Sequence, residues 1–247
     1  MTGPREAEVN RAFVALASRL VDGFDVVDLL GELTEQCTSL LDIASAGLLL
    51  ADQAGTLHVL AASSERTRLL EVFQLQRAQG PCRDCFLSGR PVSVADLEDM
   101  AERWPEFVPR ARALGFASVH ALPMRLHDRV LGTLGLFGAA IGALAPDDLA
   151  LGQALADVAS VALVQDMSVR DTGAYNGQLQ AALSSRVVLE QAKGVLAQLG
   201  GIDVSDAYLL LRRYARSKGV MLSAVAQAVV SRQIDARAVL AETVVAD

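Results

Sequence analysis

The sequence predicts an α+β domain followed by a small all-α bundle. Two segments, 45–63 and 116–140, hold pairs of strand-like apolar runs joined by short turns, as antiparallel hairpins do. Apolar residues recur at helical spacing before, between and after these hairpins. From Gln178 to Gln233 there is no strand pattern, only helical spacing. Strands in hairpins with separate helices indicate a mostly antiparallel sheet, and we expect the helices on one side of it.

The charge of the 247-residue chain is unevenly distributed. Its overall net charge of −7 argues against a protein that binds nucleic acid over its whole surface. Residues 1–183 hold 14 basic and 23 acidic residues, a net charge of −9, whereas residues 184–233 hold seven and three, a net charge of +4. Such an asymmetry is typical of a nucleic-acid module attached to an acidic body.

The first residues, "MTGPREAEVN", contain no apolar stretch of the kind found in signal peptides. No uninterrupted apolar run reaches the length of a membrane span. We therefore expect a cytoplasmic protein without membrane contact, whose three cysteines are reduced.

The elements of the first 170 residues follow from these patterns in order. Amphipathic spacing and proline positions predict helices at 5–22, 25–41, 65–78, a short one from Pro81, 98–114 with breaks at Pro105 and Pro109, and 146–168. A single strand lies within 89–97, and the second hairpin turns at His127-Asp128.

Three helices are predicted in the C-terminal part. The first spans Gln178–Leu199, the second begins at the N-cap Asp203 and stops at Gly219, and the third opens at Leu222-Ser223. The basic side chains of the second helix are expected on its outer face, opposite its apolar stripe. We divide the chain into a domain at 1–170, a linker or helical connector at 171–183, the bundle at 184–233 and a tail at 234–247.

The bundle sequence closely resembles the ANTAR domain. The stretches that carry the resemblance are "RVVLEQAKGVL" from Arg186, "AYLLLRRYAR" from Ala207 and "LSAVAQAVV" from Leu222. The resemblance implies a homodimeric protein that binds hairpin loops of nascent RNA in transcription antitermination, and no DNA partner. The residues it implies for RNA contact are Arg186, Ala192, Lys193, Gly194, Arg212, Arg213, Arg216 and Lys218.

The first domain resembles a GAF domain in "AGLLLADQAGTLHVLAAS", "QGPCRDCFLSGRPVSVADL" and "FASVHALPMRLHDRVLGTLGLFG". This resemblance implies a sensory or dimerising module with a cavity over the sheet. The chain lacks an N-K-F-D-E-type run, so cyclic-nucleotide binding is not supported, and a small-molecule ligand of unknown class is expected.

The C-x-x-C pair in "GPCRDC" allows three interpretations. A structural zinc site needs a second pair of ligands, which the sequence does not offer. A redox pair needs a lowered thiol pKa and a βαβ context. Packing explains the spacing best, because Cys82 and Cys85 share one face of a short helix. Either cysteine, together with His120, could line a sensor pocket, and His120 could equally be a buried core histidine or a haem ligand.

No catalytic motif such as a P-loop, G-x-S-x-G or H-E-x-x-H occurs, and we expect no enzyme activity and no metal site. The hypothesis is an RNA-binding antiterminator under GAF-like control. The alternatives are a regulator that binds only proteins through its basic face, and a ligand or redox sensor centred on the first domain.

Overall fold

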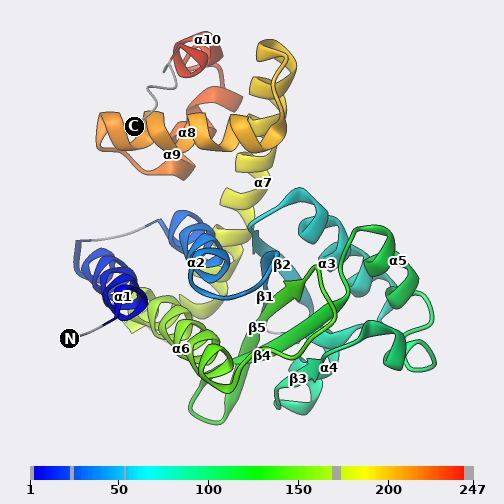
Figure 1. Cartoon of the computed structure of the whole chain (residues 1–247). Helices are drawn as coiled ribbons and strands as arrows, with labels where there is room; N and C mark the ends of the chain where they lie inside the picture. Colours follow the sequence, from blue (N-terminus) through cyan, green and yellow to red (C-terminus); the bar gives the residue numbers. More distant parts are fainter. Residues whose placement is uncertain (1–2, 23–24, 53, 169–173, 242–247) are drawn as a thin grey trace.

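The computed structural model describes residues 3–22, 25–52, 54–168 and 174–241. A sheet-containing N-terminal domain and a C-terminal helical bundle are connected by the long helix α7 (Ala174–Gly200) (Figure 1). This confirms the predicted α+β domain followed by an all-α bundle.

Five strands and seven helices make up the described part of the N-terminal domain. They are α1 (Pro4–Asp22), α2 (Val26–Leu40), β1 (Ser45–Ala51), β2 (Leu57–Ala62), α3 (Glu65–Arg77), α4 (Pro81–Ser88), β3 (Val92–Val94), the 3₁₀ helix η1 (Leu97–Met100), α5 (Phe107–Ala113), β4 (Ser118–Leu126), β5 (Arg129–Gly138) and α6 (Pro146–Ser168). Their order along the sheet is β2-β1-β5-β4-β3, and every neighbouring pair is antiparallel.

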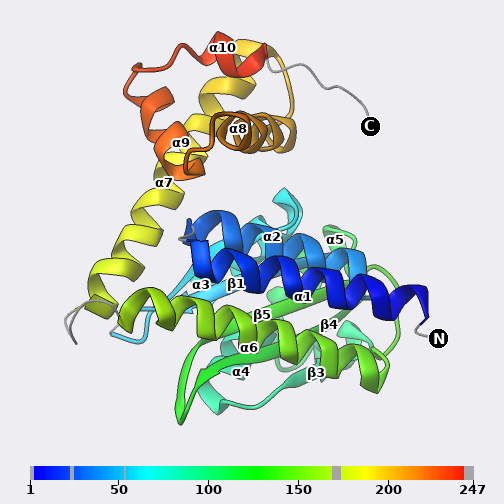
Figure 2. The ribbon, with the colours of Figure 1, turned by 90° about the vertical axis from the view of Figure 1, so that its left-hand side faces the viewer.

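Helices cover both faces of this sheet, so the expectation of helices on one side is wrong. Helices α1, α2 and α6 pack on one face, and α3, α4 and α5 on the other (Figures 1 and 2). The reason is visible in β1, where all seven residues are buried. A strand buried on both faces carries a continuous apolar run and needs a cover on each side.

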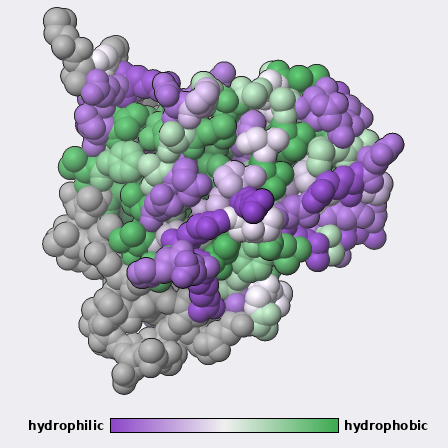
Figure 3. Space-filling model, turned by 90° about the horizontal axis from the view of Figure 1, so that it is seen from below, coloured by the Kyte–Doolittle hydropathy of each residue, from purple (hydrophilic) through white to green (hydrophobic). Residues whose placement is uncertain are grey.

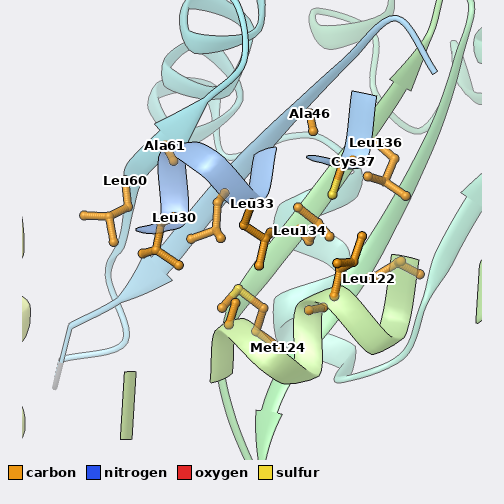
Figure 4. Close-up of a cluster of buried hydrophobic side chains, with 14 of the residues drawn as sticks. Leu30, Leu33, Cys37, Ala46, Leu60, Ala61, Leu122, Met124, Leu134 and Leu136 are labelled. Atoms are coloured by element: carbon orange, nitrogen blue, oxygen red, sulfur yellow. The ribbon is translucent and has the colours of Figure 1, made fainter. Parts of the chain in front are cut away.

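The core beneath α2 and α6 is built from aliphatic side chains. Figure 4 shows Leu30, Leu33 and Cys37 of α2 directed at Leu134 and Leu136 of β5. Along each strand successive residues point to opposite faces, so Leu48 and Leu50 join this core while Leu49 joins the other. The opposite core contains the larger rings, including Trp104, Phe107 and Phe137.

The C-terminal bundle consists of α7, α8 (Val204–Lys218), α9 (Leu222–Val230) and a short α10 (Ala236–Leu240). Asp203 caps α8 by accepting a hydrogen bond from Ser205 N, and Gly219 ends it in the left-handed conformation. Helix α10 lies in the segment expected as a tail. Asp235 caps it, and its buried Ala236 and Val239 complete the bundle core.

The two parts touch through α2, the N-terminal helix that lies beneath α8 and α9 in Figure 2. Val27 of α2 belongs to the core of the bundle. The opposite side of the N-terminal domain, away from the bundle, mixes hydrophobic and hydrophilic residues over its described surface (Figure 3). Among the described residues no single helix is long and apolar enough to cross a membrane.

Candidate nucleic-acid interface

Half of the residues predicted to contact RNA face the N-terminal domain. Arg186 and Lys193 of α7 line a cavity between the bundle and the N-terminal domain. Arg212 and Arg216 of α8 form ion pairs with α2. These four cations form the docked basic face of the bundle.

Arg212 is the centre of this face. Only 8% of its surface is exposed, although it was expected on the outside of α8. Its Nη1 lies 2.5 Å from Glu35 Oε2 and its Nη2 3.1 Å from Glu32 Oε2. Its Nε lies 3.0 Å from Asp28 Oδ1, as an ion pair without hydrogen-bond geometry. Burial by itself would lower the pKa of Arg212, but Tyr208 and the carboxylates of Glu35 and Asp28 raise it above its ordinary value.

The three carboxylates meet one guanidinium because of their spacing. Asp28, Glu32 and Glu35 stand at i, i+4 and i+7 of α2, which places them on one face of the helix. Glu32 also reaches Arg216, whose Nη2 lies 3.5 Å from its Oε2. We call these three residues the acidic stripe of α2.

Two further contacts hold α2 against the bundle. The Asp25 carboxylate accepts from Val27 N at the start of α2, and its other oxygen accepts from Ser223 N at the start of α9, at 2.7 Å. Tyr208 lies over Gly31, where a Cβ atom would stand 2.6 Å from the tyrosine Oη. Glycine at this position thus permits the close approach of the two helices.

The other predicted RNA residues lie elsewhere in the bundle. Ala192 is buried in its core, Arg213 is half-buried, and Lys218 is exposed with its Nζ 5.5 Å from the Tyr214 ring centre. Gly194 is exposed in the middle of α7, and a Cβ atom there would meet nothing within 4 Å. Contacts within the described residues therefore do not explain why position 194 holds a glycine.

The structure does not bring together the three residues proposed for a sensor pocket. Cys82 and Cys85 of α4 are buried with Val119 and Ala121 on one face of the sheet. His120 alternates with these strand residues and points to the opposite face, where its Nε2 accepts from Leu144 N at 3.4 Å. Burial lowers the pKa of His120.

The thiols lie in surroundings that suppress reactivity. Burial raises the pKa of Cys85 and of Cys37 to about 12, and raises that of Cys82 well above its ordinary value. A reactive thiolate needs the opposite shift. No group of three or more metal-ligating side chains occurs in the part of the chain that the structure describes. The packing interpretation of "GPCRDC" thus fits the structure better than the redox one.

A buried carboxyl group fills the space between α3, α4 and the sheet. Glu71 is fully buried, accepts from Gln74 Nε2, and lies 3.5 Å from Cys82 Sγ. A Cβ atom on Gly47 or Gly135 would approach its Oε1 to 2.8 and 2.9 Å, so these strand glycines make room for it. Burial raises the pKa of Glu71 to about 8.

Two domain families match the chain. The GAF domain family matches residues 25–164, more than half of the chain, and the ANTAR domain family matches residues 177–230. The protein belongs to the GAF domain family, and its C-terminal part matches the ANTAR domain. The predicted resemblances are confirmed, and the docked basic face and the acidic stripe belong to the ANTAR domain and the GAF domain respectively. No curated protein matches the sequence.

Solved structures support the GAF fold. The GAF domain of an Acinetobacter phosphoenolpyruvate-protein phosphotransferase matches with a TM-score of 0.54 at 12% identity, covering 70% of this chain and 99% of that one. Free methionine-R-sulfoxide reductase from Neisseria meningitidis matches with a TM-score of 0.53 at 14% identity, covering 69% and 96%. A phycoerythrobilin-bound GAF domain from a cyanobacterial phytochrome matches with a TM-score of 0.51 at 17% identity, covering 67% and 97%. At these identities the likeness shows the fold alone.

Glu71 makes the stability of the GAF domain depend on pH. Its pKa is about 8 in the folded chain against 4.5 for a free carboxyl, so between these values the folded chain holds a proton that the unfolded chain has released. The free energy of unfolding is expected to fall by about 3 kcal/mol more between pH 5.5 and 8 than in Glu71→Gln. Urea unfolding at both pH values measures this difference. Glu102→Gln, at an exposed site, should keep the wild-type dependence, and an equal dependence in Glu71→Gln would contradict the assignment.

The sequence patterns missed several residues of the interface. The acidic stripe and Gly31 belong to none of the stretches that carry the family resemblances, although the i, i+4, i+7 spacing of the acids was readable on an amphipathic helix. Tyr208 lies within the ANTAR-like stretch, but its contact with Gly31 was not predicted. The spacing of the acids alone does not predict that Arg212 is their partner, because Arg212 follows Glu35 by 177 residues.

Proposed function

We propose that this GAF-regulated ANTAR protein is an RNA-binding transcription antiterminator. Its ANTAR domain would bind hairpin loops in nascent transcripts, as a homodimer in the cytoplasm, with the GAF domain controlling access. The function requires no catalysis by either domain.

The observation that supports this proposal most strongly is the set of ion pairs around Arg212. One buried guanidinium with carboxylates at 2.5 and 3.1 Å shows that this face of the bundle binds anionic oxygens. RNA phosphates offer the same chemistry to arginine and lysine. In the docked arrangement the acidic stripe occupies the positions that phosphates would take.

Docking and RNA binding therefore compete for the same side chains. Arg212 and Lys193, whose side chains are only 10% and 12% exposed, can meet a hairpin only when α2 moves away from the bundle. The exposed Arg216 is held by Glu32 in the docked arrangement. A signal received by the GAF domain would act by changing the populations of docked and undocked molecules. The chain would bind RNA weakly until that change occurs.

The test uses the full chain and a fluorescently labelled two-hairpin RNA in anisotropy titrations, with tRNA as competitor. Saturable binding that tRNA does not displace, and that weakens steeply with salt, is the expected result. Equal displacement by tRNA would contradict hairpin recognition. Absence of binding even after the acidic stripe is neutralised would favour the alternative in which the basic face binds an acidic protein.

Gly194 is the basis of a separate prediction. Glycine in a helix interior costs roughly 0.5–1 kcal/mol relative to alanine, and no neighbour in the described structure requires it. Gly194→Ala is expected to raise the free energy of unfolding by about that amount, yet to weaken RNA binding because the new methyl group separates α7 from the RNA backbone. Denaturant unfolding and anisotropy measure the two effects.

The matched control is Gln198→Ala, at an exposed position one turn further along α7. It tests whether helix stabilisation alone changes RNA binding. If Gly194→Ala binds RNA as well as the wild type, this glycine has no part in the interface.

A further inference from the structure

A cavity of about 210 Å³ lies between the two domains in the docked arrangement. The end of β2 and the helices α2 and α3 line it on the GAF side, and α7 and α8 line it on the ANTAR side. At about 30 Å³ per water molecule, it holds roughly seven waters or a small organic ion of similar volume. This cavity is separate from the Glu71 cluster, whose space the protein's own side chains fill.

Arg186 of α7 is one of the residues that line this cavity. Its Nη1 is buried and has no hydrogen-bond partner within the described chain. A guanidinium keeps its charge at physiological pH, so a buried N–H without an acceptor leaves part of that charge uncompensated. Burial lowers the pKa of Arg186, in accord with incomplete compensation of its charge.

The carboxylates around the cavity are already engaged with other cations. Glu65 accepts hydrogen bonds from Arg68 Nε at 2.8 and 2.9 Å and a further one from Arg68 Nη2. Glu190 pairs with Lys193 at 3.0 Å. Glu35 pairs with Arg212 at 2.5 Å. Of the cations that line the cavity, Arg186 alone has no hydrogen-bonded carboxylate among the described residues, so its guanidinium is the one that an added anion would pair with.

We propose that this cavity binds a small oxyanion, with carboxylate or phosphate oxygens accepting hydrogen bonds from Arg186. The cations of Arg68 on the GAF side and Lys193 on the ANTAR side adjoin the same space. An anion there touches both domains at once, and a hairpin cannot enter without separating them. The anion therefore stabilises the docked arrangement.

The effect on RNA rests on the proposed function, whereas binding of the anion does not. A ligand that binds only docked molecules lowers the fraction available to RNA. The ANTAR domain would thus be repressed by a small anionic metabolite held at the domain junction.

Calorimetric titration of the full chain with inorganic phosphate and with succinate tests the site, one probe for each oxygen chemistry. We expect one site per chain for at least one probe, weakened about tenfold or more in Arg186→Gln because a charge-assisted hydrogen bond is lost. Arg186→Lys keeps the charge and should lose less affinity. Arg66→Gln, on α3 but outside the cavity, should bind like the wild type.

Two results would overturn the inference: a Kd weaker than about 1 mM for both probes, or equal affinity in wild type and Arg186→Gln. Circular dichroism of each variant confirms that it folds. If Arg186→Gln does not fold, Arg186→Lys is compared with the wild type instead. If the chain binds no RNA under any condition but binds a probe through Arg186, the proposed function fails and the site stands. If it binds RNA but neither probe, the site fails and the proposed function stands.

Discussion

Neutralising the acidic stripe with Asp28→Asn, Glu32→Gln and Glu35→Gln is expected to raise the affinity of the full chain for hairpin RNA about tenfold or more. The three changes leave Arg212 buried at the interface without an anionic partner. Breaking a buried ion pair costs about 3–5 kcal/mol. A third of that cost already changes the ratio of docked to undocked molecules about tenfold. Anisotropy titration of wild type and variant at one salt concentration gives the ratio of affinities.

Net charge has to be separated from docking in this experiment. The triple change Asp42→Asn, Asp99→Asn and Glu102→Gln alters the charge equally at exposed positions of the GAF domain. It should give only a small, strongly salt-dependent increase in affinity. If both triple variants gain the same RNA affinity, the acidic stripe does not cover a surface that binds RNA.

In the chain with the neutralised stripe, Lys193→Ala together with Arg212→Ala is expected to weaken RNA binding about tenfold to a hundredfold. Each phosphate contact that is lost removes about 0.7–0.9 from the slope of log affinity against log salt, so the pair should flatten it by up to about 2. This background matters because Arg212→Ala in the wild-type chain would also undock the domains, and the two effects would oppose each other.

Titrations at several salt concentrations measure both quantities. Arg90→Ala with Arg110→Ala removes two exposed cations of the GAF domain and should leave the slope unchanged. An unchanged slope after loss of Lys193 and Arg212 would show that RNA does not bind this face of the bundle.

Local patterns predicted the elements of this fold well, because each depends on neighbours in sequence. The hairpin turn at His127-Asp128, the cap at Asp203 and the stop at Gly219 all lie where spacing and residue type placed them. Helix α10 was missed because five residues carry too little periodicity. Its cap Asp235 and buried Val239 become significant only against the packed bundle.

Relations across the two domains could not be predicted from the sequence. The basic surface of α8 was identified, but which of its cations would be covered depended on where α2 lies. Likewise, Cys82, from the GAF resemblance, and His120, from its place within a strand, were both considered for one sensor pocket. Only the sheet, with α4 over one face and His120 directed at the other, separates them. Which side chains are covered or brought together depends on the packing of elements distant in the sequence, and this packing is known only from the folded structure.

Helix α7 belongs to two hydrophobic cores at once. Ala182 packs in the core of the GAF domain, and Leu189 packs in the core of the ANTAR domain. Seven residues of α-helix separate them, a span of about 10 Å with no loop between. The domains therefore cannot part as two bodies on a flexible tether. Undocking must either bend this helix between the two cores or pull its first turns off the sheet domain, so the free energy of switching includes the cost of helical hydrogen bonds or of exposed apolar surface.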